Sequence, residues 1–261
     1  MRTAGISLLA YDIAYFEESV RSYVDIVDEV VIGLDENRET WSGGTFELDS
    51  EITGKLLGVS DKVRIIQDQF YMPGLSPMEN DTRERNFLSS HIEGADWLLS
   101  VDSDELLMNA QDLDEFLHAQ KDKSSCVLGN WVSVYKELDD SYLVVGKDGE
   151  IFLHPTPIVT AVPEIFINAR WTTQSNIMSP AILLHFTWAR SEAELRRKLA
   201  NWSHSSDFSI EHHFDLWVNA DGNNYKTYKD FHPLTADAWP GLVKIAKDDL
   251  RTVSRKLARS A

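Results

Sequence analysis

The chain is poor in cysteine and in basic residues. Its 261 residues include one cysteine, Cys126, so no disulfide can form within the chain and the fold does not depend on oxidation. The 25 lysines and arginines stand against 42 aspartates and glutamates, which gives a net charge of -17. Nucleic-acid binders and polybasic membrane anchors both need a basic face, so this balance disfavours both classes.

Long apolar segments are also missing. No stretch approaches the roughly 20 apolar residues that a membrane-spanning helix needs, and the apolar run at 4–10 is too short for the core of a signal peptide. The sequence therefore predicts a soluble, cytoplasmic protein without an integral membrane segment, and it leaves the oligomeric state open. Hydrophobic residues make up 43% of the chain and charged residues 26%, values typical of a globular protein with a substantial core.

Strand and helix patterns alternate over the first 120 residues. Short apolar or β-branched runs predict strands at 4–10, 29–34, 62–66 and 97–101. Helical spacing, glycines and capping residues predict helices at 13–24, between Gly43-Gly44 and Leu57, from a capping box at Asp81–Glu84 to Gly94, and after Asn109. Strands that alternate with helices predict a parallel sheet with right-handed crossovers.

The pattern changes after residue 120. Longer strands are predicted at 125–137, 142–146, 150–154, 158–168 and 181–188. A second capping box at Ser191–Glu194 predicts a helix, and the tail at 239–257 predicts another with a basic end. No repeat, low-complexity segment or linker marks a boundary, so we expect a single domain over residues 1–261.

An acidic cluster, Asp102-Ser103-Asp104-Glu105, comes directly after the apolar strand at 97–101. Ligands of parallel α/β sheets bind beyond the carboxyl ends of the strands, and Asp35 follows the strand at 29–34 in the same way. Mg²⁺ and Mn²⁺ favour carboxylate oxygens together with phosphate oxygens and water. A D-x-D match is weak evidence by itself, but its position at a strand end predicts a divalent-metal site.

Glu84-Arg85-Asn86 stands near a helix start, and Gly94-Ala95-Asp96-Trp97 leads into a strand that ends in D-x-D-E. These segments, together with the run at 27–32, resemble the family 2-type glycosyltransferases of the GT-A fold. The resemblance covers about residues 4–110 and continues more loosely through 184–188. It implies a GT-A-type mixed, mainly parallel α/β sheet flanked by helices. Residues 1–120 would form the nucleotide-sugar-binding half, and residues 121–261 the acceptor-side half with a C-terminal helix.

The same resemblance implies a metal-dependent glycosyltransferase. It would move a sugar from a UDP- or GDP-sugar to a hydroxyl of a saccharide acceptor. Mn²⁺ or Mg²⁺, held by Asp102, Asp104 and His185, would neutralise the departing nucleoside diphosphate. The donor-binding residues that the resemblance implies are Asp35, Arg85, Asp102 and Ser103. The run 35–39 departs from the family's D-D-x-S-x-D pattern, so the choice between UDP and GDP stays open.

The catalytic base is left open by the sequence. An inverting transfer needs a base near the acceptor hydroxyl, and Glu164 is the first candidate, with Asp139, Asp140 and Asp207 as rivals. His185 lies in an apolar strand, where a structural core histidine is an equal alternative to a metal ligand. The pair at 212–213 lacks a histidine at i+4, so a zinc site there is discounted.

Two other functions fit parts of the pattern. A haloacid-dehalogenase-like phosphohydrolase would use Asp102 as its nucleophile, but that motif normally follows the first strand, whereas here it follows the fourth predicted strand. A non-catalytic protein of the same fold that binds a sugar or nucleotide is the second alternative. A Rossmann dehydrogenase is disfavoured because the chain has no G-x-G-x-x-G.

Overall fold

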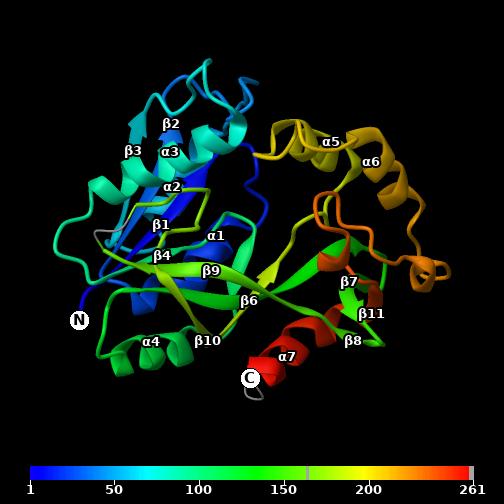
Figure 1. The fold of residues 1–261 in the computed structure, drawn as a ribbon. Coiled ribbons are helices and arrows are strands. Elements are labelled where there is room, and N and C mark those ends of the chain that lie inside the picture. The colour runs from blue at the N-terminus through cyan, green and yellow to red at the C-terminus, as the bar shows by residue number, and fades with distance from the viewer. Residues whose placement is uncertain (163–164, 259–261) are drawn as a thin grey trace.

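Four parallel strands form the sheet of the N-terminal half. The computed structural model, which describes residues 1–162 and 165–258, orders these strands β4-β1-β2-β3. They are β1 (Thr3–Leu9), β2 (Glu29–Asp35), β3 (Val63–Asp68) and β4 (Trp97–Ser100). The helices between them are α1 (Phe16–Tyr23) with the 3-10 turn η1 (Val24–Ile26), α2 (Ser50–Leu57) and α3 (Pro77–Ser90). The predicted alternation of strands and helices is confirmed (Figure 1).

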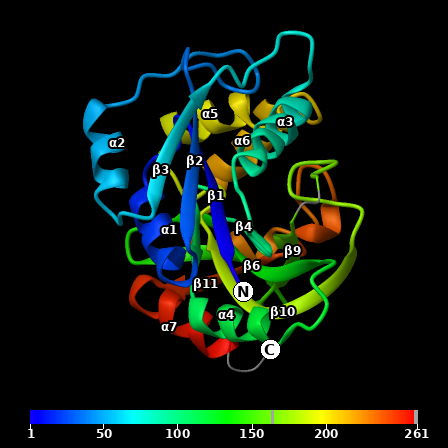
Figure 2. The same cartoon turned by 90° about the vertical axis from the view of Figure 1, so that its left-hand side faces the viewer.

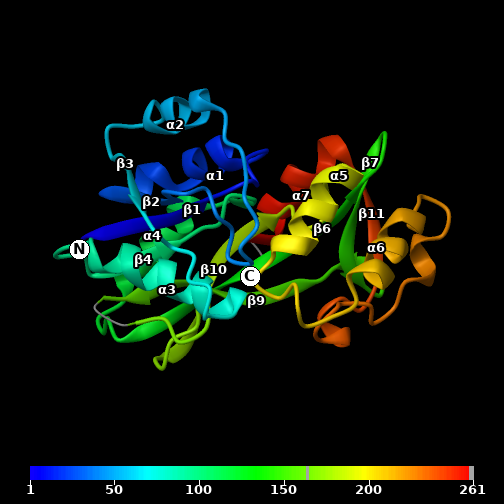
Figure 3. The same cartoon turned by 90° about the horizontal axis from the view of Figure 1, so that it is seen from above.

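The two faces of this sheet are covered by different helices. Val20 of α1 and Leu56 of α2 share a core cluster with Ile32 of β2, whereas Leu88 of α3 packs in another cluster with Val31. Successive residues of a strand point to opposite faces, so α1 and α2 cover one face and α3 covers the other. Figures 2 and 3 show the sheet between these two layers. Burial on both faces explains why the strands at 29–34 and 97–101 are continuously apolar.

The second half extends the same sheet with mostly antiparallel strands. Its order continues from β4 through β9, β6 and β7 to β11, and β10 pairs with both β5 and β6. Only the β6–β10 pair is parallel among the described strands of this half. The strands are β5 (Glu105–Leu107), β6 (Ser125–Glu137), β7 (Ser141–Lys147), β8 (Glu150–Ile151), β9 (Leu153–Ala161), β10 (Ser175–His185) and β11 (Leu242–Ala246). The expected mixed α/β sheet flanked by helices is therefore confirmed.

Helices again pack on both faces of this extension. Leu195 of α5 and Phe214 of α6 share a cluster with Tyr135 of β6, and Leu250 of α7 packs with Val134 on the opposite face. The helical elements are α4 (Ala110–Ala119), α5 (Glu192–Asn201), α6 (Ile210–Asn219), η2 (Tyr225–Thr227), η3 (Ala236–Ala238) and α7 (Lys247–Ala258). Figure 1 shows α5 and α6 beside the carboxyl ends of the N-terminal strands. No helix in the described part of the chain is long and apolar enough to cross a membrane.

Several predicted boundaries are wrong. The third helix is capped by Ser76, not Asp81: Ser76 Oγ accepts from the backbone N–H of Glu79, and the Glu79 side chain completes the box. Asp81 lies inside the helix, where it is buried against Arg85. A capping box is a local pattern that occurs by chance wherever an acid follows a polar residue by three positions. This stretch of the chain has two such pairs, Ser76–Glu79 and Asp81–Glu84.

The tail and two other segments also differ from the prediction. The predicted helix at 239–257 is divided into β11 and α7, because the apolar run 242–246 pairs with β7. The predicted strand at 158–168 ends at Ala161, and residues 165–168 lie outside any strand. The helix predicted between Gly43-Gly44 and Leu57 begins only at Ser50, with Asp49 as its cap.

Candidate active site

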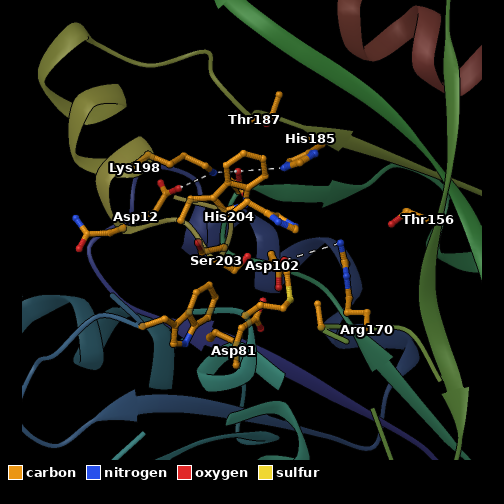
Figure 4. Close-up of a pocket in the computed structure, with 18 of the residues that line it drawn as sticks. Asp12, Asp81, Asp102, Thr156, Arg170, His185, Thr187, Lys198, Ser203 and His204 are labelled. Atoms are coloured by element: carbon orange, nitrogen blue, oxygen red, sulfur yellow. Dashed lines mark hydrogen bonds and ion pairs between the residues drawn. The ribbon is translucent and has the colours of Figure 1, made fainter. Parts of the chain in front are cut away.

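A cavity of about 490 Å³ opens at the carboxyl ends of β1, β2 and β4. Leu9, Asp35 and Asp102 line it from these strand ends, and Lys198 and Asn201 line it from α5. The size falls in the range of about 300–1,000 Å³ that is typical of small-molecule sites. As predicted, Asp35 and Asp102 face one crevice. Figure 4 shows the side chains that converge on it from both halves of the chain.

Asp102 is held by a buried arginine. Arg85 Nη2 donates to Asp102 Oδ1 at 2.9 Å and to Oδ2 at 3.2 Å, while its Nε donates to Asp81 and its Nη1 to Ser100. The Arg85 side chain is only 2% exposed, so this arrangement is fixed. Burial alone would raise the pKa of Asp102, but the guanidiniums of Arg85 and Arg170 outweigh it and lower that pKa. Asp102 therefore stays ionised, with its orientation set by α3.

The Glu105 side chain supports the backbone of the Asp102-Ser103-Asp104 segment. It begins β5, and its side chain is fully buried. Glu105 Oε2 accepts from the backbone N–H of Asp102, and both carboxylate oxygens accept from Arg170, at 2.7 and 2.8 Å. Trp131 Nε1 donates to Oε1 at 2.6 Å. Glu105 thus anchors the backbone of Asp102.

Asp104 faces three nitrogen-bearing side chains. Its Oδ2 lies 2.6 Å from Lys198 Nζ, 3.0 Å from Arg190 Nη2 and 3.4 Å from His185 Nε2. Asp12, from the loop after β1, pairs with Arg190 and Lys198 as well. Burial would raise the pKa of Asp104, yet Lys198 and the other charged neighbours hold it well below its usual range.

The ligand set implied for Mn²⁺ or Mg²⁺ is brought together, but it does not fit a divalent cation. Asp102, Asp104 and His185 all line the cavity, but both oxygens of Asp102 and Oδ2 of Asp104 already accept hydrogen bonds from guanidinium or ammonium groups. No group of three acidic, histidine or cysteine side chains over residues 1–162 and 165–258 is arranged to hold a metal ion. Cation affinity depends on uncompensated ligand charge, and here that charge is largely balanced.

Asp35 lines the cavity but serves the backbone. Its Oδ1 accepts from the N–H groups of Asn37 and Glu39, and its Oδ2 from those of Phe70 and Tyr71. The four donor–acceptor distances are 2.8–3.2 Å, and the side chain is buried. The carboxylate therefore shapes the loops after β2 and β3. Asp35, expected above to bind the donor, thus has both carboxylate oxygens engaged by the backbone of these loops.

The other predicted residues divide into three groups. Ser103 is buried and lines the cavity. Glu164 lies outside the described residues. Asp139 and Asp140 are exposed at the β6–β7 turn and do not line the cavity.

Three further side chains that line the cavity carry no signal that the sequence patterns above pick out, namely Lys198, Arg170 and His204. Lys198 lies on α5, where the apolar residues at helical spacing indicate only the face that packs against the core. Arg170 lies in an irregular loop that carried no motif. His204 lines the cavity, and its Nδ1 lies 2.7 Å from Asp207 Oδ2, a spacing of three residues that was visible in the sequence. Asp207 was weighed as a base in its own right, whereas the structure makes it the partner of His204.

Comparisons with known proteins give distant likenesses. No protein-family model matches the chain, and no curated protein sequence matches it. Staphylococcus aureus TarS has a TM-score of 0.42 at 15% identity, over 84% of this chain and 42% of that one. Glucosyl-3-phosphoglycerate synthase from Mycobacterium tuberculosis, solved with Mn²⁺, uridine diphosphate and phosphoglyceric acid, has a TM-score of 0.33 at 14% identity, over 51% and 43%.

A third likeness has a different name. Mannose-6-phosphate isomerase from Helicobacter pylori has a TM-score of 0.34 at 14% identity, over 57% of each chain. The present chain spans less than two thirds of the length of each of these three proteins. Likenesses this distant carry no argument about its activity, so the functional case rests on the cavity itself.

Proposed function

We propose that this cavity transfers a sugar from a nucleoside-diphosphate sugar, UDP- or GDP-linked, to a hydroxyl of a saccharide acceptor. The observation that carries the proposal is the placement of Asp102 and Asp104 in a 490 Å³ cavity at the ends of parallel strands, with Arg85 pinned against Asp102. These are the residues of the 84–105 run that resembles the family 2-type glycosyltransferases. The sequence pattern and the three-dimensional site thus support the same reaction.

The two sides of the cavity suit the two substrates. The donor side is built from the loops after β1, β2 and β4, where ligands of such sheets bind. The acceptor side carries tryptophans from the second half: Trp131, Trp171, Trp202 and Trp239. Aromatic faces suit the apolar faces of sugar rings, and a tryptophan N–H can also donate to a hydroxyl. The loop 39–45 links the sides, since Thr40 Oγ1 donates to Asn201 Oδ1 at 2.6 Å.

His204 is the base that we assign to an inverting transfer. Its Nδ1 faces the Asp207 carboxylate, which fixes the tautomer that leaves Nε2 as the acceptor of a proton. Its ring packs edge-on against Trp202, at 5.0 Å between centroids, which holds it beside the cavity. Glu164 stays a rival candidate.

The phosphohydrolase alternative is less well supported. A nucleophilic aspartate must present a free oxygen to phosphorus, whereas both oxygens of Asp102 accept hydrogen bonds from a fixed arginine. The non-catalytic alternative predicts donor binding without turnover.

A panel of UDP- and GDP-sugars tests the proposal, with binding followed by calorimetry and turnover by release of nucleoside diphosphate. Each donor is assayed in EDTA and in Mn²⁺. We expect one donor to bind and to be turned over slowly by water even without acceptor. Absence of binding by every donor under both conditions would refute the proposal. Phosphate release from simple phosphomonoesters, lost in Asp102→Asn, would favour the hydrolase, and binding without any turnover would favour the non-catalytic protein.

A further inference from the structure

Lys198 extends from α5 into the part of the cavity where the two motif aspartates lie. Its Nζ is 2.6 Å from Asp104 Oδ2 and 3.2 Å from Asp12 Oδ2, and the side chain is 12% exposed. Figure 4 shows Lys198 and His185 approaching the centre of the site from α5 and from the end of β10. The capping box at Ser191 fixes the start of α5 and so the direction from which Lys198 enters.

A second cation secures the same carboxylate from behind. Arg190 is 3% exposed, pairs with Asp12 and Asp104, and donates to the carbonyl of Phe186 at 2.8 Å. A divalent ion at Asp104 Oδ2 would have to displace both Arg190 and Lys198 from it. Removing a buried cation from its partner leaves an uncompensated charge, which is costly.

The charges around the motif are nearly balanced without a metal. Five carboxylates meet four permanently basic side chains, namely Asp12, Asp81, Asp102, Asp104 and Glu105 against Arg85, Arg170, Arg190 and Lys198. Arg85, Arg170 and Arg190 are each 7% exposed or less, and so belong to the scaffold. Lys198 is the most exposed of these four basic groups, at 12%, and it lines the cavity from α5.

We propose that the Lys198 ammonium takes the place of the divalent cation: it binds the donor's diphosphate and neutralises the leaving group, so that transfer requires no metal. This inference rests on the proposed function. An ammonium has three N–H donors, and two are used by Asp12 and Asp104 in the described structure, which leaves one for a phosphate oxygen. The two carboxylates hold the ammonium in place before the donor arrives. A charged group that is already oriented stabilises the charge that develops on the leaving group most effectively.

The step balances without a further reactant. The acceptor oxygen forms a bond to the anomeric carbon, and the bond from that carbon to the diphosphate oxygen breaks. The bonding electron pair leaves with the nucleoside diphosphate, whose added negative charge meets Lys198. The proton of the acceptor hydroxyl passes to His204 Nε2. Asp104 and Asp12 act by positioning Lys198.

Binding of UDP and of GDP, measured by calorimetry in EDTA and in Mn²⁺, tests the inference in wild type, Lys198→Met and Lys198→Arg. We expect wild-type affinity to differ by less than about threefold between the two conditions. Lys198→Met should weaken binding in EDTA about tenfold or more, and Lys198→Arg should keep most of it. Lys55→Met removes the same charge from exposed helix α2 and serves as the matched control.

Mn²⁺ itself gives a second readout. Lys198→Met leaves Asp104 and Asp12 with less compensation, so we expect this variant to gain Mn²⁺ affinity, detected by electron paramagnetic resonance without any nucleotide. Wild-type binding that appears only with Mn²⁺, or unchanged affinity in Lys198→Met, would overturn the metal-free inference and leave the transferase proposal standing. Absence of UDP and GDP binding in every condition would overturn both.

Discussion

The backbone N–H of Asp102 donates to the buried carboxylate of Glu105 at 3.0 Å, so the motif carries its own support three residues along the chain. Arg170 completes that support by binding both oxygens of Glu105 and the carbonyl of Ser100. The position of Asp102 therefore depends on a buried ion pair that joins β5 to the loop before β10. This relationship yields the first prediction.

Arg170→Met should destabilise the fold by about 3 kcal/mol, because it leaves a fully buried carboxylate without its cation. The measurement is the free energy of unfolding from guanidinium titrations. Adding Glu105→Gln should restore part of the loss, since an amide has no charge to compensate and still accepts from Trp131. Arg21→Met breaks an exposed pair with Glu17 and should change stability by less than about 0.5 kcal/mol. Equal effects of Arg170→Met and Arg21→Met would contradict this reading.

Glu84 should make stability depend on pH. Burial, only partly offset by the hydrogen bond from Trp41, raises its pKa to about 8. Between its ordinary value of 4.5 and about 8 the folded state holds a proton that the unfolded state releases. The unfolding free energy should therefore fall as pH rises through this window.

Glu84→Gln tests that dependence, because glutamine keeps the acceptor for Trp41 and has no proton to lose. Relative to wild type, the variant should gain on the order of a few kcal/mol between about pH 5 and pH 9. Guanidinium titrations across this range give the slopes. Glu47→Gln, on an exposed loop, is the control and should leave the wild-type slope unchanged. A Glu84→Gln profile parallel to that of wild type would show that Glu84 does not titrate in this range.

His204→Ala should lower kcat about 10²-fold and leave nucleoside-diphosphate binding within about twofold, because a general base acts on the acceptor and not on the donor. Asp207→Asn should have a smaller effect on kcat, since the histidine remains. His212→Ala removes an exposed histidine of α6 and should have no effect. Transfer assays at saturating donor separate kcat from KM. If Glu164→Gln abolishes transfer while His204→Ala does not, the base is the acid first expected from sequence.

Helix α3 should lose stability when its true cap is removed. Ser76→Ala removes both hydrogen bonds of the Ser76 hydroxyl with Glu79 and keeps the one that the Ser76 backbone N–H donates to the Glu79 side chain, so it should cost about 1 kcal/mol in thermal or chemical unfolding. Thr53→Ala, at a half-buried position whose hydroxyl donates to the carbonyl of Ser50 within α2, provides a comparison that should cost less. An unchanged unfolding free energy in Ser76→Ala would show that tertiary packing alone fixes the start of α3.

Sequence patterns predicted the sheet of the N-terminal half well because burial on both faces demands continuous apolar runs. They also placed Asp102 and Asp104 at a strand end, since a polar residue directly after such a run marks that end. The start of α3 was misplaced because Ser76 and Asp81 both head an acceptable capping box, and only packing distinguishes them. The tail was misread because 242–246 is apolar at both helical and strand spacing, and its pairing with β7 is not local.

The charge network of the site was beyond prediction for a different reason. Asp104 meets Lys198 across 94 residues and Asp12 meets Arg190 across 178. Neither cation belongs to a motif: Lys198 lies on α5, whose apolar spacing indicates only its core-facing side, and Arg190 lies in the loop between β10 and α5. The acidic residues indicate a site that binds a positively charged group. Only the fold shows that Arg190 and Lys198 of the same chain supply that charge.

We propose above that this cavity breaks the bond between a sugar and a nucleoside diphosphate. The most direct test is release of UDP or GDP from the donor panel, with saccharide acceptors present, by wild type and by Asp104→Asn. We predict release from at least one donor by wild type, with a loss of about 10²-fold in Asp104→Asn, whose Lys198 would no longer be held in position. Donor release that is equal in both proteins, or absent from both, would contradict the account.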